Sequence, residues 1–115
     1  MKTIKVNSEL DIPEYYTGIA EWEDQVKGWY KNGDLHREDG PATIEVKDYE
    51  SWWLNGKYIY GSTKNESVKL RFTNEIILSK SQHPEYPTVQ VWKILDSNGL
   101  YDFIVIPGME KHIVE

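Results

Sequence analysis

One short stretch of the chain gathers side chains that could transfer protons. It consists of His36, Arg37, Glu38 and Asp39, the only dense cluster of ionisable residues in the 115-residue sequence. An imidazole beside a carboxylate can supply a general base and a general acid, as in many hydrolases. A structural role is favoured, because Arg37 can bridge carboxylates across a turn and His36 can hydrogen-bond the backbone. We therefore expect no enzymatic activity.

The aromatic residues form a second group, which could take part in binding. Ten of the fifteen lie between Tyr15 and Tyr60. Rigid rings offer contact area at low entropic cost, and Trp and Tyr dominate the hot spots of protein interfaces. Because the chain has only two Phe and two Met, filling the interior is the favoured role of these rings. The predicted partner-binding residues are Trp29, Tyr30, Arg37, Trp52, Trp53 and Tyr58, with Trp22 and Tyr60 as further members of the aromatic set.

Sites for metals, cofactors and phosphates are not predicted. The chain has no cysteine, and no two of His36, His83 and His112 are spaced to lie on one face of an element. No glycine-rich run opens a helix, so Gly40-Pro41 and Pro107-Gly108 are expected to be turns and not phosphate-binding loops. The sequence thus predicts neither a metal nor a cofactor.

Charge and hydropathy narrow the range of partners. The net charge is −6, and binding through phosphates needs clustered Lys and Arg, so direct contact with nucleic acid is not expected. No apolar run approaches the roughly 18 residues of a membrane span. Residues 1–10 alternate charged and apolar side chains instead of forming the apolar region of a signal peptide. A cytoplasmic location without membrane contact is therefore expected.

Two similar segments of the first half must position the aromatic residues. Gly18-Ile19-Ala20 matches Gly40-Pro41-Ala42 at an offset of 22, and residues 29–33 match residues 52–56 at an offset of 23. Each segment ends in Asn-Gly, which tolerates positive φ at both central positions of a type I′ turn. The sequence therefore predicts two β-hairpin repeats within residues 15–61.

Pairing counted outward from each turn predicts which side chains face one another. The pairs about Asn32-Gly33 are Lys31 with Asp34, Tyr30 with Leu35, and Trp29 with His36. The pairs about Asn55-Gly56 are Leu54 with Lys57, Trp53 with Tyr58, and Trp52 with Ile59. Because successive residues of a strand point to opposite sides, Trp29 and Trp52 are expected on one face. Tyr30 and Trp53 are expected on the other.

The second half is also expected to be extended. Segments 67–73, 89–95 and 100–106 are rich in β-branched and aromatic residues, which is typical of strands. Residues 96–99, Asp-Ser-Asn-Gly, are predicted to form a four-residue loop. This register sets Lys93 opposite Asp102 and Trp92 opposite Phe103, an ion pair and an aromatic pair.

Two segments of the second half decide the organisation of the chain. Residues 74–82 fit either a short helix capped by Thr73 or a buried strand, and Pro84 and Pro87 end the element in either case. Residues 61–67 are the most loop-like stretch and the expected seam between the halves. Because each half alone would make a marginal core, residues 1–115 are expected to form a single, mainly β domain of consecutive antiparallel hairpins.

The segment from Asn32 to Ala42 resembles the "NGxxHREDGPA" unit of a MORN-like repeat family common among small proteins of tailed bacteriophages. In that family an aromatic pair precedes the Asn-Gly, as Trp29-Tyr30 does here, and each repeat is a β-hairpin stacked on the last. The resemblance covers about residues 15–61, without a second His-Arg-Glu-Asp, and residues 62–115 resemble no family in the same way. The structural motif residues are Asn32, Gly33, His36, Arg37, Asp39, Gly40, Pro41, Asn55 and Gly56.

Because a related bacterial group is antitoxin-like, the resemblance implies binding of a protein or small ligand and no catalysis. We expect a non-catalytic phage accessory protein that inhibits or modulates a host protein, such as a defence or toxin factor, through a sheet face or edge strand. The alternative is sequestration of a nucleotide-like signalling molecule, with Arg37 or lysines on its phosphates. That alternative calls for an oligomer, such as a homodimer. A hydrolase using His36 with Glu38 or Asp39 is the least favoured hypothesis.

Overall fold

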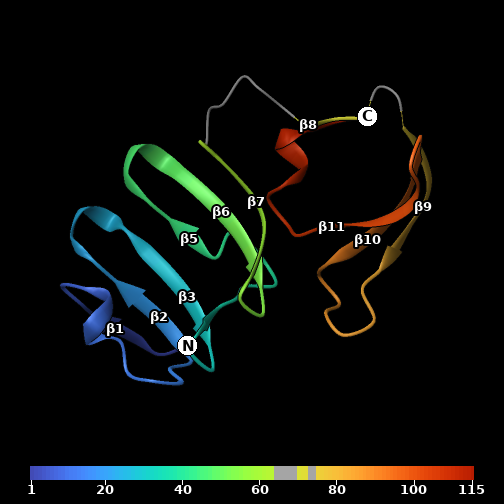
Figure 1. Ribbon diagram of the computed structural model, residues 1–115. Helices are drawn as coiled ribbons and strands as arrows, with labels where there is room; N and C mark the ends of the chain where they lie inside the picture. Colours follow the sequence, from blue (N-terminus) through green and yellow to red (C-terminus); the bar gives the residue numbers. More distant parts are fainter. Residues whose placement is uncertain (64–69, 73–74) are drawn as a thin grey trace. The chain divides into compact units, whose positions relative to one another are not determined.

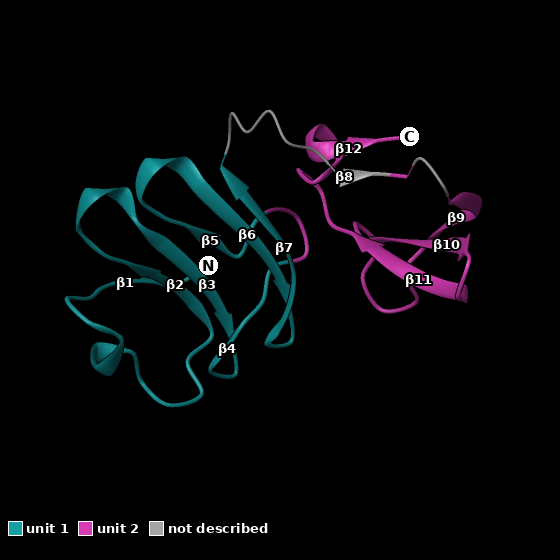
Figure 2. Cartoon of the chain, turned by 45° about the horizontal axis from the view of Figure 1, so that its top comes forward, with its two compact units in different colours: residues 1–37, 41–65 teal, residues 38–40, 66–115 magenta. Residues whose placement is uncertain are grey.

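The computed structural model describes residues 1–63, 70–72 and 75–115, and their regular structure consists of β-strands joined by turns and short 3-10 turns (Figure 1). The described residues contain no helix longer than a three-residue 3-10 turn. The chain divides into two compact units, residues 1–37 with 41–65 and residues 38–40 with 66–115 (Figure 2). The predicted mainly β fold of antiparallel hairpins is confirmed. The single core predicted for the whole chain stays a prediction.

The first unit is a seven-stranded sheet. Its strands follow the order β1-β2-β3-β5-β6-β7, with β4 paired to β3, and they lie side by side in Figure 1. All neighbours are antiparallel except β1 and β2, which are parallel. The strands are β1 (Thr3–Lys5), β2 (Gly18–Glu21), β3 (Lys27–Lys31), β4 (Asp34–Leu35), β5 (Thr43–Ile44), β6 (Tyr49–Leu54) and β7 (Lys57–Thr63).

The two predicted repeats have the same fold. The first consists of β2, β3 and β4, and the second consists of β5, β6 and β7. Both Asn-Gly turns have left-handed backbone at their two central residues, with φ of 52° and 87° at Asn32 and Gly33 and of 49° and 78° at Asn55 and Gly56. Positive φ at both positions is the signature of the type I′ turn, so the predicted turns are confirmed.

Each repeat also contains a second tight turn that the sequence did not reveal. The 3-10 turn η2 (Glu23–Gln25) joins β2 to β3, and η3 (Val46–Asp48) joins β5 to β6. Both hold two consecutive non-glycine residues in the left-handed region, with φ of 61° and 65° in η2 and of 59° and 58° in η3. Such backbone costs about 1 kcal/mol or more per residue and persists only where surrounding bonds enforce it. Backbone bonds from Trp22 to Val26 (2.8 Å) and from Glu45 to Tyr49 (2.7 Å) close the turns.

The predicted registers of the first unit hold near the turns and fail farther out. Four pairs are confirmed, namely Lys31 with Asp34, Tyr30 with Leu35, Leu54 with Lys57, and Trp53 with Tyr58. Strand β4 ends before His36, but the backbone N–H of His36 still donates to the Trp29 carbonyl at 2.9 Å. The pairing of Trp52 with Ile59 is wrong. Trp52 faces Tyr60, because a β-bulge leaves one extra residue on β7.

The segment expected to be a loop at the seam begins as a strand. Gly61–Thr63 continues β7 opposite β6, so the loop prediction is wrong for these three residues. Residues 64–67 lie outside the described part of the chain. The division into two units nevertheless falls within this segment, between residues 65 and 66.

The second unit contains a three-stranded antiparallel sheet and a short parallel pair. The order of the sheet is β11-β10-β9, and β12 pairs with β8. The 3-10 turn η4 (Glu110–His112) precedes β12. The strands are β8 (Leu70–Arg71), β9 (Ile76–Gln82), β10 (Gln90–Asp96), β11 (Gly99–Val105) and β12 (Ile113–Val114).

The structure resolves the ambiguities of the second half. Residues 76–82 form a strand, which ends before Pro84, so no helix is present there; residues 73 and 74 lie outside the described residues. The expectation that this strand is buried is wrong, because every residue of it except Ile77 is exposed. The predicted register of β10 and β11 is confirmed, with Lys93 Nζ 2.8 Å from Asp102 Oδ1. The loop is shorter than expected, because Asp96 and Gly99 also pair. Of the strand predicted at 67–73, residues 70–71 are observed as β8, while 67–69 and 73 are not described.

Candidate functional site

One face of the first unit's sheet carries a row of small residues. Across β2, β3, β5, β6 and β7, successive partners form a row that runs perpendicular to the strands. Residues directly opposite one another point to the same side of a sheet. The row consists of Ala20, Gly28, Thr43, Ser51 and Gly61. We call this side of the sheet the open face.

Aromatic rings lie over this row because the small residues leave room for them. A Cβ added to Gly28 would lie only 2.9 Å from Cε2 of Tyr30, so the Tyr30 ring covers that glycine. The indole of Trp53 leans toward Ser51, whose hydroxyl accepts its N–H at 2.8 Å. At Gly61 an added Cβ would lie 2.8 Å from the Tyr58 hydroxyl. The rings are thus held along the sheet, which fixes their orientation before any partner arrives.

Two adjoining grooves open on this face. The larger has a volume of about 590 Å³ and the smaller about 390 Å³. Gly28, Thr43 and Ser51 of the small-residue row line the smaller groove. The two grooves share four lining residues, which are Glu9, Tyr30, Leu35 and Trp53. Tyr30 and Trp53 occupy equivalent positions of the two repeats, so the repetition itself places two half-buried rings at one site.

Tyr15 lines the larger groove in an unusual backbone conformation. Its φ is 59°, in the left-handed region that bulky residues rarely adopt, and its side chain is 73% exposed. The neighbouring backbone holds it there, since the carbonyl of Tyr16 accepts the N–H of Gly33 at 2.9 Å. The larger groove is therefore lined by an exposed tyrosine ring in a left-handed turn.

The larger groove is acidic. Glu9, Glu14 and Asp34 line it, all three are exposed, and none of them forms an ion pair within the described residues. No Lys, Arg or His is among the described residues that line this groove. Burial raises the pKa of the Tyr30 hydroxyl above its usual value, and the negative charge of Glu9 adds to that rise. The groove thus combines aromatic rings with three acidic residues, one of which, Asp34, lies opposite Lys31 in the sheet.

The ionisable cluster at 36–39 makes structural contacts. His36 is 6% exposed, and its Nδ1 accepts the backbone N–H of Asn55 at 2.9 Å. The Arg37 guanidinium lies 4.0 Å from the centre of the Trp29 ring, and its Nη1 donates to the Pro41 carbonyl at 3.1 Å. His36 therefore binds the turn of the second repeat to the first.

The same attachment recurs one repeat earlier, with another residue type. The Thr17 hydroxyl accepts the backbone N–H of Asn32 at 2.9 Å, as His36 does for Asn55. Beside each of these bonds, the glycine of the turn donates to the preceding segment, Gly33 to Tyr16 and Gly56 to Leu35, both at 2.9 Å. Each Asn-Gly turn is thus held by two equivalent hydrogen bonds. The side-chain acceptor of the second turn, His36, belongs to the repeat motif, whereas that of the first turn, Thr17, does not.

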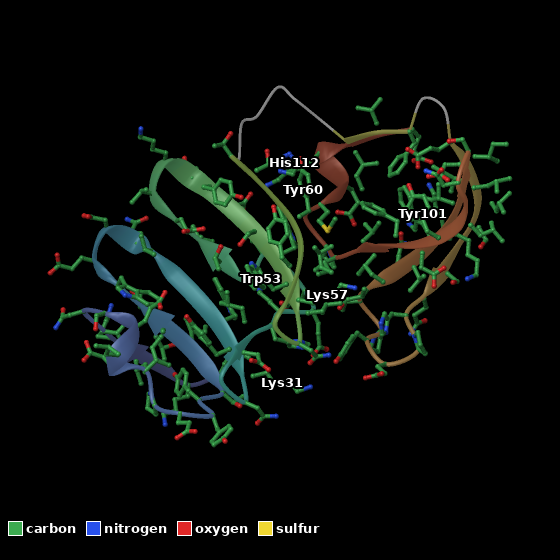
Figure 3. All side chains as sticks on the ribbon, viewed as in Figure 1. Lys31, Trp53, Lys57, Tyr60, Tyr101 and His112 are labelled. Carbon is green, nitrogen blue, oxygen red and sulfur yellow. The ribbon has the colours of Figure 1, made fainter. Side chains whose placement is uncertain are left out.

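The predicted partner-binding residues lie on both faces of the sheet. Trp52 is fully buried, so its ring is a core residue and its assignment to a docking surface is wrong. Trp29 is half-buried under Arg37, on the same face as Trp52. Tyr30 and Trp53 lie on the open face, with Tyr58 49% exposed and edge-on to Trp53 at 5.4 Å. Trp53, on β6, and Tyr60, which pairs with Trp52 from β7, are labelled in Figure 3.

Several groove residues were not predicted. They are Glu9, Glu14, Tyr15, Asp34 and Leu35. The first three belong to the segment before the first repeat, which has no repeat motif, and only the backbone path brings them to the open face. The exposed, positive-φ tyrosine could not have been found from its residue type, because Tyr has no preference for that region.

Other kinds of site find no support among the described residues. No group of three or more His, Asp and Glu there is arranged to hold a metal ion. No helix in this part of the chain is long and apolar enough to span a membrane. Comparison with protein-family models, with curated proteins and with solved structures found no match to the chain. The resemblance to the MORN-like family therefore stays a prediction based on residues 29–42.

Proposed function

We propose that this chain is a non-catalytic binding protein that docks a partner protein on the open face of its first unit. One observation carries the proposal. Tyr30 and Trp53, at equivalent positions of the two repeats, line the same two grooves and remain half-exposed there. Rings already oriented by the sheet lose little freedom on binding, so their contact area contributes to affinity at low cost.

The surroundings of His36 favour binding over hydrolysis. Its Nδ1 is already the acceptor for the Asn55 backbone, and its side chain is buried. None of residues 36–39 is among the described residues that line the grooves. A general base must reach the proton it removes, and this imidazole is engaged in holding two repeats together.

Charge favours a protein partner over a nucleotide. The larger groove carries three carboxylates, which repel phosphate groups. Of the residues predicted to hold phosphates, Arg37 or lysines, Arg37 stacks on Trp29 instead of lining a groove, and Lys27 lines only the smaller groove. If the resemblance to the phage family holds, the partner is a host protein, such as a defence or toxin factor, that the docked chain inhibits or modulates.

Photo-crosslinking tests the docking face directly. With p-benzoylphenylalanine at position 15, in the larger groove, ultraviolet irradiation in a bacterial lysate should give a discrete crosslinked product. Position 100 is the matched control, because Leu100 is 65% exposed and lies in the second unit. The product from position 15 should disappear when Trp53→Ala is added. Equal products from both positions, or a product indifferent to Trp53→Ala, would contradict the proposal.

A further inference from the structure

We infer that the larger groove binds a lysine or arginine side chain presented by a basic segment of the partner protein. This inference rests on the proposed docking function and specifies the chemistry of what docks. It is argued from the charge of the groove, the rings that line it and its continuity with the smaller groove.

Negative charge converges on the larger groove from three separate places in the chain. Glu9 belongs to η1 (Glu9–Asp11), Glu14 to the segment that follows, and Asp34 to β4. None of the three forms an ion pair within the described residues, and no described cationic residue lines the groove. Like charges gathered around a concave surface raise the local concentration of cations and steer them to it. A cationic side chain is the group that this arrangement attracts.

The rings provide the second half of the recognition. A Lys or Arg cation is attracted to the face of Trp or Tyr when it lies within about 6 Å of the ring centre. The protein already uses this contact elsewhere, with Arg37 at 4.0 Å from the Trp29 ring and Lys2 Nζ at 5.4 Å from the Tyr16 ring. Tyr15, Tyr30 and Trp53 supply three rings beside the three carboxylates. A neutral apolar ligand would use the rings but not the carboxylates of the groove.

The smaller groove fixes the orientation of the partner's basic segment. It is lined by Lys27 as well as by Glu9 and Glu45, so its charge is mixed, and Gly28, Thr43 and Ser51 line it with small side chains. Because Tyr30 and Trp53 line both grooves, one extended segment can occupy both. The cationic side chain belongs in the larger groove, and an uncharged stretch of the same segment belongs in the smaller.

Binding of a blocked peptide of alternating glycine and arginine tests the inference by calorimetry at low salt. Peptides with serine or glutamate in place of arginine serve as ligand controls. The arginine peptide should bind with saturation at one site, and Asp34→Asn or Glu9→Gln should weaken it by about tenfold. Asp48→Asn and Glu23→Gln remove the same charge from exposed turn residues that do not line the grooves, and should change the affinity little.

Three other outcomes would overturn the inference. Equal weakening by the groove variants and their controls would mean that only the net charge of the protein matters. Tighter binding of the glutamate peptide would reverse the proposed charge preference. Spermidine, competing at the same concentration of charge, would indicate a site for free cations and not for a peptide. Melting temperatures of all four variants verify that each is folded.

The failure of this inference can be told apart from failure of the docking function. If the arginine peptide does not bind while crosslinking from position 15 still depends on Trp53, the open face docks a partner of other chemistry. If crosslinking from position 15 is also independent of Trp53, the docking function itself is wrong.

Discussion

The two faces of the first unit's sheet carry similar aromatic residues that differ in burial. Trp52 and Trp53 are neighbours on β6 and therefore point to opposite sides. Trp52 is fully buried, whereas Trp53 is half-buried at the boundary of two grooves. The comparison shows that aromatic content alone does not separate core from binding surface. What separates them is how far each face is buried.

The open face differs from the buried face in the residues between its rings. Its small-residue row lets the rings of Tyr30 and Trp53 lie along the sheet. On the opposite face, Trp52 packs 6.0 Å from Tyr60, its cross-strand partner beyond the bulge. The open face has a cross-strand aromatic pair as well, Trp53 with Tyr58 at 5.4 Å, but its rings lie over small side chains and stay partly exposed. Substitutions should therefore affect stability on one face and binding on the other.

The largest effect is expected for Trp52→Ala on the buried face. Removing a fully buried Trp leaves a cavity and should lower the free energy of unfolding by about 3 to 5 kcal/mol. Urea denaturation followed by circular dichroism measures the change. A loss below about 1 kcal/mol would show that this ring is not part of the core.

The attachment of one repeat to the next should give an intermediate effect. His36→Ala removes a buried side chain and leaves the Asn55 N–H without its acceptor in a partly buried place, so we expect a loss of about 1 to 3 kcal/mol in the free energy of unfolding. Thr17→Val is the matched change in the first repeat. Because Thr17 is exposed and water can replace its hydroxyl, that loss should stay at about 1 kcal/mol or less. Similar losses in the two variants would contradict this order.

Trp53→Ala sharpens the comparison between the faces. Because part of this ring is in contact with water, the free energy of unfolding should fall by about 1 to 2 kcal/mol, clearly less than for Trp52→Ala. Partner crosslinking from position 15 should nevertheless be lost. If the two adjacent Trp variants lose equal stability, the distinction between a structural face and a docking face fails.

The smallest effect concerns alkaline pH on the open face. Burial, together with a hydrogen bond to Tyr49, raises the pKa of Tyr58 to about 12. Since the unfolded tyrosine titrates near about 10, the unfolded state loses its proton first as the pH rises. The stability contributed by neutral Tyr58 is therefore complete below about pH 10 and lost as the pH approaches about 12. Melting temperatures in this range should fall less steeply for Tyr58→Phe than for the wild type, and parallel curves would refute the assignment.

The sequence was sufficient where local rules decide the structure. Asn-Gly at 32–33 and 55–56 specifies a type I′ turn, and a two-residue loop fixes which neighbours pair, so Trp53 was correctly placed opposite Tyr58. The alternation of side chains along a strand then correctly placed Trp52 and Trp53 on opposite faces. The same reasoning predicted the register that joins Lys93 to Asp102. All of these depend on residues close together in the chain.

Tertiary structure alone decided the rest. The bulge beside Ile59 has no residue signal, and the left-handed turns η2 and η3 have only a weak one in Asp24 and Asp48, because Asp tolerates positive φ without requiring it. Which face stays open could not be predicted, since burial depends on what distant segments cover. The segment carrying Glu9 and Tyr15 precedes β2 and carries no repeat motif, yet it forms a wall of the groove beside Trp53. Turns and strand alternation follow from short-range sterics, whereas exposure follows from contacts between residues far apart in the chain.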